Sequence, residues 1–248
     1  MPDDAPAATL LAIDAGNSDT VAALFAGGRL LAHRRAATDH AVPAEPLLRA
    51  LLAGAAPRAT VVATPGPRLD AGYRALIRSL LGHPPTVLVA DPVGPDRRAN
   101  AAAAHALVGG ACIVADLGTA TTVDAVDAAG RLVGGAIAPG LAVAAAALAA
   151  AADRLEPVAL EAPPAAIGRD TETAMRSGAV LGHAGLVDGL VDRFRGELGA
   201  ELPVVATGGL AGVVAPHCRT VGRVEPLLTL EGLRLLWEAA PAPVADPA

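Results

Sequence analysis

Apolar and polar residues follow the same pattern in two stretches of the chain, residues 10–31 and 112–133. In each stretch an apolar run ends at an aspartate, Asp14 or Asp116, and a glycine-containing turn follows. A second apolar run comes next, and another glycine turn leads into a third. Glycine turns between short apolar runs are typical of β-hairpins. Each stretch is therefore predicted to form three successive antiparallel strands, with an Asp-x-Gly sequence at the first turn.

The two stretches also resemble each other residue by residue, which indicates an internal duplication. Residues 14–30 and 116–132 align without a gap, and nine of the 17 positions are identical. We therefore expect two related halves, residues 1–108 and 109–240, and a disordered Pro/Ala-rich tail at 241–248. The identical pairs are Asp14/Asp116, Gly16/Gly118, Thr20/Thr122, Val21/Val123, Ala23/Ala125, Ala26/Ala128, Gly28/Gly130, Arg29/Arg131 and Leu30/Leu132.

Helical and strand-like segments follow each predicted hairpin, which indicates an α/β fold. Residues 132–152 carry no charge and are long enough to span a bilayer. Glycines and a proline interrupt their first half, however, so a strand, a loop and a helix are the favoured interpretation. Helices are predicted at 44–53, 68–81, 142–154 and 171–198, with an apolar helical pattern at 99–107, and buried strands at 61–64, 86–90 and 203–207.

Composition excludes several kinds of chemistry. The 248 residues include no lysine, and all 19 cationic side chains are arginines. A Walker A loop, a protein-kinase site and a Schiff-base enzyme each need a lysine. The net charge of -6 provides no basic surface for nucleic acid. Two cysteines without metal spacing favour a reducing compartment, and the acidic N-terminus does not resemble a signal peptide.

The two Asp-x-Gly turns are candidate phosphate-binding loops. Glycine lets a phosphate approach the backbone, and successive amide groups can surround an anion. The aspartate, Asp14 in the first loop, can hold a divalent cation on the nucleotide. A single Asp-x-Gly is most often a plain tight turn, but two matching copies favour phosphate binding. Loops from the two halves are expected to face each other across a cleft. The first loop comprises Asp14, Ala15, Gly16, Asn17, Ser18, Asp19, Thr20 and Val21.

Three further segments are candidate site elements. Gly94, Pro95, Asp96 and Arg97 precede the helical pattern at 99–107, where an aspartate is usually a helix N-cap. A Gly/Pro loop at 134–140 separates a predicted strand from a helix. Gly208 and Gly209 follow a buried strand and can let a flat adenine ring approach the backbone, although the same pattern is often only a loop.

Taken in order, these motifs resemble those of type III pantothenate kinases, members of the acetate/sugar kinase–Hsc70–actin superfamily that are similar to Bvg accessory factor proteins. The resemblance covers residues 10 to about 238. It implies duplicated ribonuclease-H-like, actin-like ATPase domains with an ATP cleft between them. The segments that carry it are DAGNSDTV, GPDR, DLGTATTVD, GGAIAPGL, IGRDTETAMRSG, GLVDGLVDR, ATGGLA and EPLLTLEGLRLL.

The resemblance implies ATP-dependent and Mg²⁺-dependent phosphorylation of pantothenate, the first step of coenzyme A synthesis, by a cytoplasmic homodimer. It gives Asp116 the role of ligand to a monovalent cation, K⁺ or NH₄⁺, and Thr119 that of an ATP contact. Residues 94–97 would bind the acceptor, and Asp96 would take its proton. Thr171 would contact the substrate across the dimer.

Two alternatives remain open. Only a short segment joins the predicted strand at 86–90 to residues 94–97, and the only tyrosine, Tyr73, lies further upstream. Because the family has a tyrosine in its acceptor pocket, this difference favours a kinase of the same fold that acts on another small alcohol. The other alternative is a nucleotide-binding accessory protein with little catalytic activity. The presence of Asp14, Asp96 and Asp116 argues against it.

Overall fold

The computed structural model describes residues 9–89 and 93–240, which divide into two compact units. The first unit contains the described residues up to 99 together with those from 229, and the second contains residues 100–228. The sequence repeat places the boundary near residue 108 and all of 109–240 in one half. In the structure the last helix instead belongs to the first unit. The predicted disordered tail at 241–248 and the end of the predicted strand at residue 90 lie outside the described residues.

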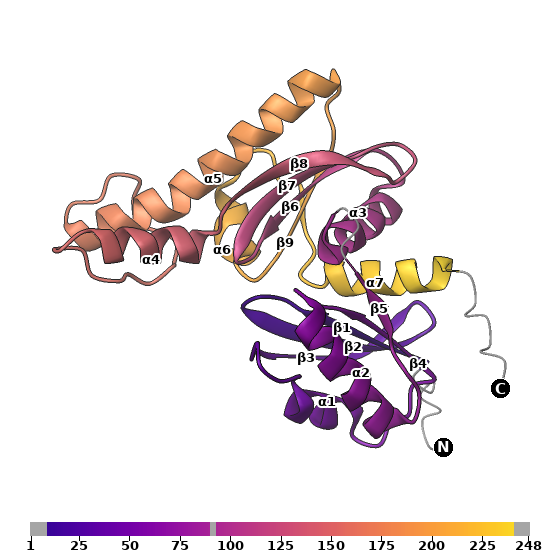
Figure 1. The fold of residues 1–248 in the computed structure, drawn as a ribbon. Coiled ribbons are helices and arrows are strands. Elements are labelled where there is room, and N and C mark those ends of the chain that lie inside the picture. The colour runs from indigo at the N-terminus through magenta and orange to yellow at the C-terminus, as the bar shows by residue number, and fades with distance from the viewer. Residues whose placement is uncertain (1–8, 90–92, 241–248) are drawn as a thin grey trace, which may run out of the picture. The chain divides into compact units, whose positions relative to one another are not determined.

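The first unit contains a five-stranded mixed sheet with the order β3-β2-β1-β4-β5 (Figure 1). The first three strands form the predicted antiparallel meander, and β4 and β5 add in parallel beside β1. The strands are β1 (Leu10–Ala15), β2 (Asp19–Ala26), β3 (Arg29–Ala37), β4 (Ala59–Ala63) and β5 (Thr86–Leu88), and the helices are α1 (Glu45–Leu52), α2 (Pro67–Leu81) and α7 (Leu228–Ala239).

The second unit repeats this arrangement, with the order β10-β9-β6-β7-β8 and the same parallel and antiparallel pairings. The matching topology confirms the predicted duplication and the α/β fold class. The strands are β6 (Cys112–Leu117), β7 (Ala120–Val126), β8 (Leu132–Pro139), β9 (Val204–Thr207) and β10 (Arg223–Val224), and the helices are α3 (Pro95–Val108), α4 (Leu141–Ala151), α5 (Thr171–Leu198), α6 (Ala211–Val214) and a 3₁₀ turn at Ala215–His217.

Alternation along the strands gives each sheet two different faces. In the first unit Leu11 and Leu24 pack with α1 and α2, whereas Phe25 lies on the other face, under the Arg234 guanidinium of α7 at 5.9 Å. In the second unit Ala115 and Leu117 belong to a core that α5 and α6 complete. Asp116, between them, faces α3.

The predicted helices are present with small shifts at their ends, and α5 has the predicted bounds. Helix α7 occurs where the pattern predicts no element. Residues 132–152 form β8 followed by α4, and most of the loop predicted at 134–140 belongs to β8, which extends to Pro139. None of the helices in the described part of the chain is long and apolar enough to cross a membrane. Helix α3 begins at Pro95, four residues before the predicted apolar pattern.

Candidate functional site

The first predicted phosphate loop joins β1 to β2. The amide of Gly16 donates to the carbonyl of Asp19 at 2.9 Å, which closes the turn. A Cβ atom on residue 16 would stand only 3.0 Å from that carbonyl oxygen, so glycine fits the turn without a shift of the backbone. Asn17 and Ser18 at its tip are exposed. The loop thus presents an open backbone directly after Asp14, as a phosphate-binding loop requires.

A buried hydroxyl cluster supports this loop from below. The Thr20 hydroxyl is 3.0 Å from that of Thr38, and the Thr38 amide donates to the carbonyl of Ser18 at 2.9 Å. The phenol of Tyr73 accepts from the amide of Ala44 at 3.3 Å and also hydrogen-bonds Thr20. Burial raises the pKa of Tyr73, and the nearby negative charge of Asp14 adds to the increase. Tyr73 therefore stabilises the first loop from within the core through its hydrogen bond with Thr20. The sequence pattern does not predict this role.

The segment at residues 94–97 forms the start of α3. Pro95 is buried at the first position of the helix, whereas Asp96 is exposed in its first turn. Asp96 is therefore not the N-cap that its position in the sequence suggests, because the helix begins one residue earlier. A Cβ atom on Gly94 would collide with Oδ1 of Asp96, so glycine gives that carboxylate room. The Arg98 guanidinium donates to the Val89 carbonyl at 2.6 Å and ties α3 to the segment after β5.

The second loop joins β6 to β7 and is one residue shorter than the first, because Leu117 pairs with Thr121 whereas Ala15 pairs with Thr20. The amide of Gly118 donates to the carbonyl of Ala120 at 3.1 Å, and Thr119 is exposed at the tip. Asp116 is half-buried at the end of β6, where the side-chain amide of Asn100 donates to its Oδ2 at 2.9 Å. Asn100 was not a candidate from sequence, because a single asparagine inside an alanine-rich helix gives no motif.

Two other predicted motifs meet this second loop. The amide of Gly140, at the end of β8, donates to the carbonyl of Thr119 at 3.1 Å. Gly208 follows β9, which pairs in parallel with β6 so that Thr207 lies beside Asp116. Gly208 adopts a φ of 95°, and a Cβ atom there would lie 2.6 Å from Oδ1 of Asp116. The second unit therefore brings residues 116–120, Gly140 and Gly208 into one site.

The strand that follows the second loop carries polar side chains on both faces. On the face of Asp116, the Thr122 hydroxyl donates to the buried carboxylate of Asp124 at 3.2 Å. On the opposite face, Thr121 Oγ1 is 2.7 Å from Nε2 of His183 in α5. Burial lowers the pKa of His183. These contacts anchor β7 on both sides.

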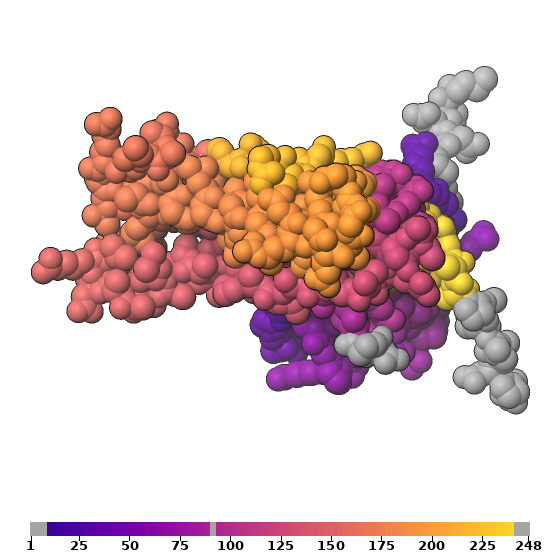
Figure 2. Space-filling view, turned by 90° about the horizontal axis from the view of Figure 1, so that it is seen from above, coloured from indigo at the N-terminus to yellow at the C-terminus, as the bar shows by residue number. Residues whose placement is uncertain are grey.

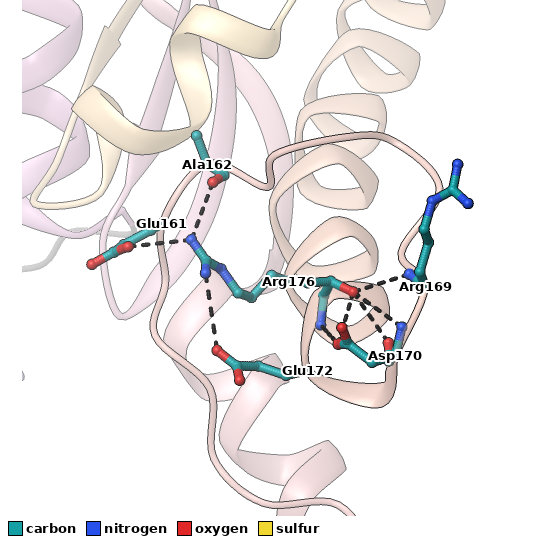
Figure 3. A network of polar contacts seen from close by, with 7 residues as sticks. Glu161, Ala162, Arg169, Asp170, Glu172 and Arg176 are labelled. Carbon is teal, nitrogen blue, oxygen red and sulfur yellow. Dashed lines mark hydrogen bonds and ion pairs between the residues drawn. The ribbon is translucent and has the colours of Figure 1, made fainter.

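Thr171 lies elsewhere in the second unit, at the exposed start of α5. Asp170 and Thr173 form a capping box there, in which the Thr173 amide donates to Oδ1 of Asp170 at 2.7 Å. Arg176, one turn further, donates to Glu161 at 3.2 Å and to the carbonyl of Ala162, and these contacts hold the preceding loop against α5 (Figure 3). Figures 1 and 2 show this end of α5 projecting beyond the sheet of its unit beside α4.

The described residues contain no group of three or more His, Cys, Asp or Glu side chains that could hold a metal ion. A nucleotide-bound Mg²⁺ commonly takes only one or two carboxylates together with substrate phosphates. Asp14 is suitably placed at the end of β1 for that role. Asp116 offers one carboxylate beside the backbone carbonyls of its loop, which are the oxygen ligands that a monovalent cation accepts.

Comparison with known proteins agrees with this construction. Residues 10–193 match the family model described as type III pantothenate kinase. The chain is 41% identical to the type III pantothenate kinase of Moorella thermoacetica over 92% of its own length and 98% of the relative's. It is 43% identical to that of Thermobifida fusca, with the same coverage of both chains.

Among solved structures, the ethanolamine utilization protein EutJ of Carboxydothermus hydrogenoformans aligns with a TM-score of 0.58 at 18% identity, over 94% of this chain and 91% of that one. At this identity the likeness shows the fold alone, which is the duplicated actin-like ATPase fold that the motifs imply. The matched family model and the relatives of similar length together show that the chain belongs to the type III pantothenate kinase family.

Proposed function

We propose that this protein phosphorylates pantothenate with ATP, forming 4'-phosphopantothenate in the first step of coenzyme A synthesis. The observation that carries the proposal is the site in the second unit, where Gly140 and Gly208 enclose the Asp116 loop in a chain that belongs to this family. Glycine at both positions keeps the loop backbone accessible, and phosphoryl transfer depends mainly on positioning and charge neutralisation.

Each motif then has a defined task. Asp14 to Val21 and Thr119 bind the ATP phosphates, and Gly208 and Gly209 border the adenosine. Asp14 would hold the Mg²⁺ ion and Asp116 a monovalent cation, K⁺ or NH₄⁺, and these ions neutralise phosphate charge when bound.

The acceptor is handled by the start of α3. Gly94, Pro95 and Arg97 border the substrate, and the Arg97 guanidinium can pair with the pantothenate carboxylate. Asp96 is exposed in the first turn of α3, where its carboxylate can accept the proton of the attacking hydroxyl. Gly94 supports this role because any side chain at that position would displace the carboxylate.

A different small alcohol as acceptor is the second candidate, and Tyr73 is the observation that favours it. The tyrosine is 1% exposed in the core of the first unit, with its phenol bound to Ala44 and Thr20. It is the only tyrosine of the chain, so no tyrosine is available to line an acceptor pocket.

A coupled ADP-release assay separates these candidates. The assay should contain ATP, Mg²⁺ and K⁺, and either pantothenate or one of a panel of small hydroxy acids. Turnover with pantothenate at the highest kcat/KM supports the proposal, whereas preference for another alcohol selects the second candidate. ATP binding without turnover of any acceptor would instead identify a nucleotide-binding accessory protein.

We also propose that the enzyme is a cytoplasmic homodimer in which Thr171 contacts the substrate bound by the partner. Helix α4 supports the dimer, because it contains no charged residue yet exposes most of its side chains. Val143 is 44% exposed and Leu148 is 49% exposed. An uncharged, exposed apolar surface of this kind is typical of an interface.

Sedimentation of a Leu148→Glu variant tests this surface. A charge buried in an apolar interface should convert the dimer to monomer. Leu198→Glu is the matched control, because Leu198 is similarly exposed at 42% but lies at the opposite end of α5. A wild-type monomer, or a Leu148→Glu variant that remains dimeric, would contradict the assignment.

A further inference from the structure

Asn100 is buried in the second turn of α3, with 1% of its surface exposed, and its side-chain amide is 2.9 Å from Oδ2 of Asp116. A buried amide is costly unless its polar atoms find partners. An alanine-rich helix could fill this position with another alanine at lower cost. The presence of asparagine here therefore points to a task at the Asp116 carboxylate.

The surroundings of Asp116 show what that task is. Its other oxygen, Oδ1, lies close to two glycines. A Cβ atom added to Gly208 would stand 2.6 Å from Oδ1, and one added to Gly118 would stand 3.3 Å from it. The carboxylate thus occupies space that side chains at these two positions would take. The hydrogen bond from Asn100 thus holds Oδ2, while glycine at both positions leaves room for Oδ1.

The chemical nature of the donor also matters. An amide is neutral, so its hydrogen bond orients a carboxylate without compensating its charge, whereas an arginine or lysine in its place would form an ion pair. A second carboxylate, Asp124, is buried on the same face of the sheet, and it accepts from the equally neutral Thr122 hydroxyl. A carboxylate whose direction is fixed by a hydrogen bond is suited to binding a cation.

We propose that Asn100 is a positioning residue that aims the Asp116 carboxylate at a monovalent cation beside the β6–β7 loop. The inference rests on the proposed function, because it takes Asp116 as the ligand of that cation. The inference adds Asn100 to the site. Helix α3 would then orient the Asp116 carboxylate through Asn100 and also carry the acceptor segment at its start.

The test measures cation binding without turnover. Thermal stabilisation of the ADP·Mg²⁺ complex should be titrated with KCl at constant ionic strength, using NaCl as the balancing salt. Asn100→Leu keeps the shape of the side chain and removes the donor, and Asn100→Ala removes the side chain. Both are expected to need ~10-fold more K⁺ for half-maximal stabilisation, because a hydrogen bond to a charged group is lost.

Thr121→Val is the matched control. It also removes one buried hydrogen bond from the second unit, but on the face of β7 opposite Asp116. It should lower the melting temperature and leave the K⁺ midpoint unchanged. If all three variants shift that midpoint equally, or if Asn100→Leu leaves it unchanged, Asn100 has only a structural role.

The titration also separates this inference from the proposed function. A K⁺-dependent stabilisation that Asn100→Leu weakens supports the role of Asn100 whether or not pantothenate is the acceptor. Absence of any K⁺ effect in the wild-type complex overturns the inference, even in a protein that phosphorylates pantothenate.

Discussion

Replacing Gly208 with alanine should destabilise the second unit by ~2–5 kcal/mol, from two separate costs. Gly208 has a φ of 95°, a left-handed conformation that costs an L-residue ~1–2 kcal/mol. The new Cβ atom would stand 2.5 Å from the carbonyl carbon of Leu117 and 2.6 Å from its amide nitrogen. Relieving such an overlap by shifting well-packed backbone costs a further ~1–3 kcal/mol.

Urea unfolding followed by circular dichroism measures this loss. The single tryptophan, Trp237, lies in α7 and reports on the first unit, so its fluorescence is unsuited to the purpose. Gly212→Ala is the control, because residue 212 lies in α6 and an added Cβ meets nothing within 4 Å. That change should be neutral or stabilising by up to ~1 kcal/mol, as expected for alanine in a helix.

The reasoning fails if Gly208→Ala unfolds within ~1 kcal/mol of the wild type, since each of the two costs alone reaches that value. It fails equally if Gly212→Ala is as destabilising, because the effect would then not depend on the local geometry. Calorimetric titration should show weaker ATP binding by Gly208→Ala and unchanged binding by Gly212→Ala, because only the first change displaces Asp116.

Three further predictions follow from single side chains. Burial lowers the pKa of His183. Acidification below its unfolded pKa of ~6.5 therefore protonates the unfolded state first, and stability is lost as the pH falls toward the folded pKa. His183→Gln should flatten the dependence of urea midpoints on pH below ~6.5, and an unchanged slope would contradict the assignment. Tyr73→Phe removes the acceptor for the Ala44 amide and should cost ~1–2 kcal/mol in urea unfolding; a variant as stable as the wild type would show that water replaces the phenol. Asp96→Asn should lower kcat by ~10²–10⁴-fold in the ADP-release assay and leave ATP affinity unchanged by calorimetry; wild-type turnover would remove Asp96 as the proton acceptor.

Local patterns predicted the elements that depend on neighbouring residues. The two hairpins follow from short apolar runs punctuated by glycine. Helix α5 was predicted with its observed bounds, and its first turn has a strong local signal, because Asp170 and Thr173 cap it reciprocally. The same locality explains why the Asp-x-Gly turns could be identified: each turn closes on itself, through Gly16 with Asp19 and through Gly118 with Ala120.

Contacts between distant residues were not predictable in the same way. Tyr73 reaches Thr20, and Asn100 reaches Asp116, only because strand pairing and helix packing place them together. No spacing rule in a single sequence encodes such pairs, and an asparagine among alanines looks like an ordinary helix position. The start of α3 was predicted too late for a related reason: buried Pro95 begins the helix, whereas the apolar pattern becomes visible only from residue 99.

The placement of α7 in the first unit has a consequence for synthesis of the chain. The strands β1 to β5 leave the ribosome early, but the helix that covers the Phe25 face of their sheet is translated only after the whole of residues 100–228. At a translation rate of roughly 5–20 residues per second, that apolar face remains without α7 for several seconds or longer. The second unit, which is continuous in sequence, can complete its core during this interval. The segment translated first is thus completed last, and the nascent protein is expected to depend most on chaperones while its N-terminal sheet lacks the final helix.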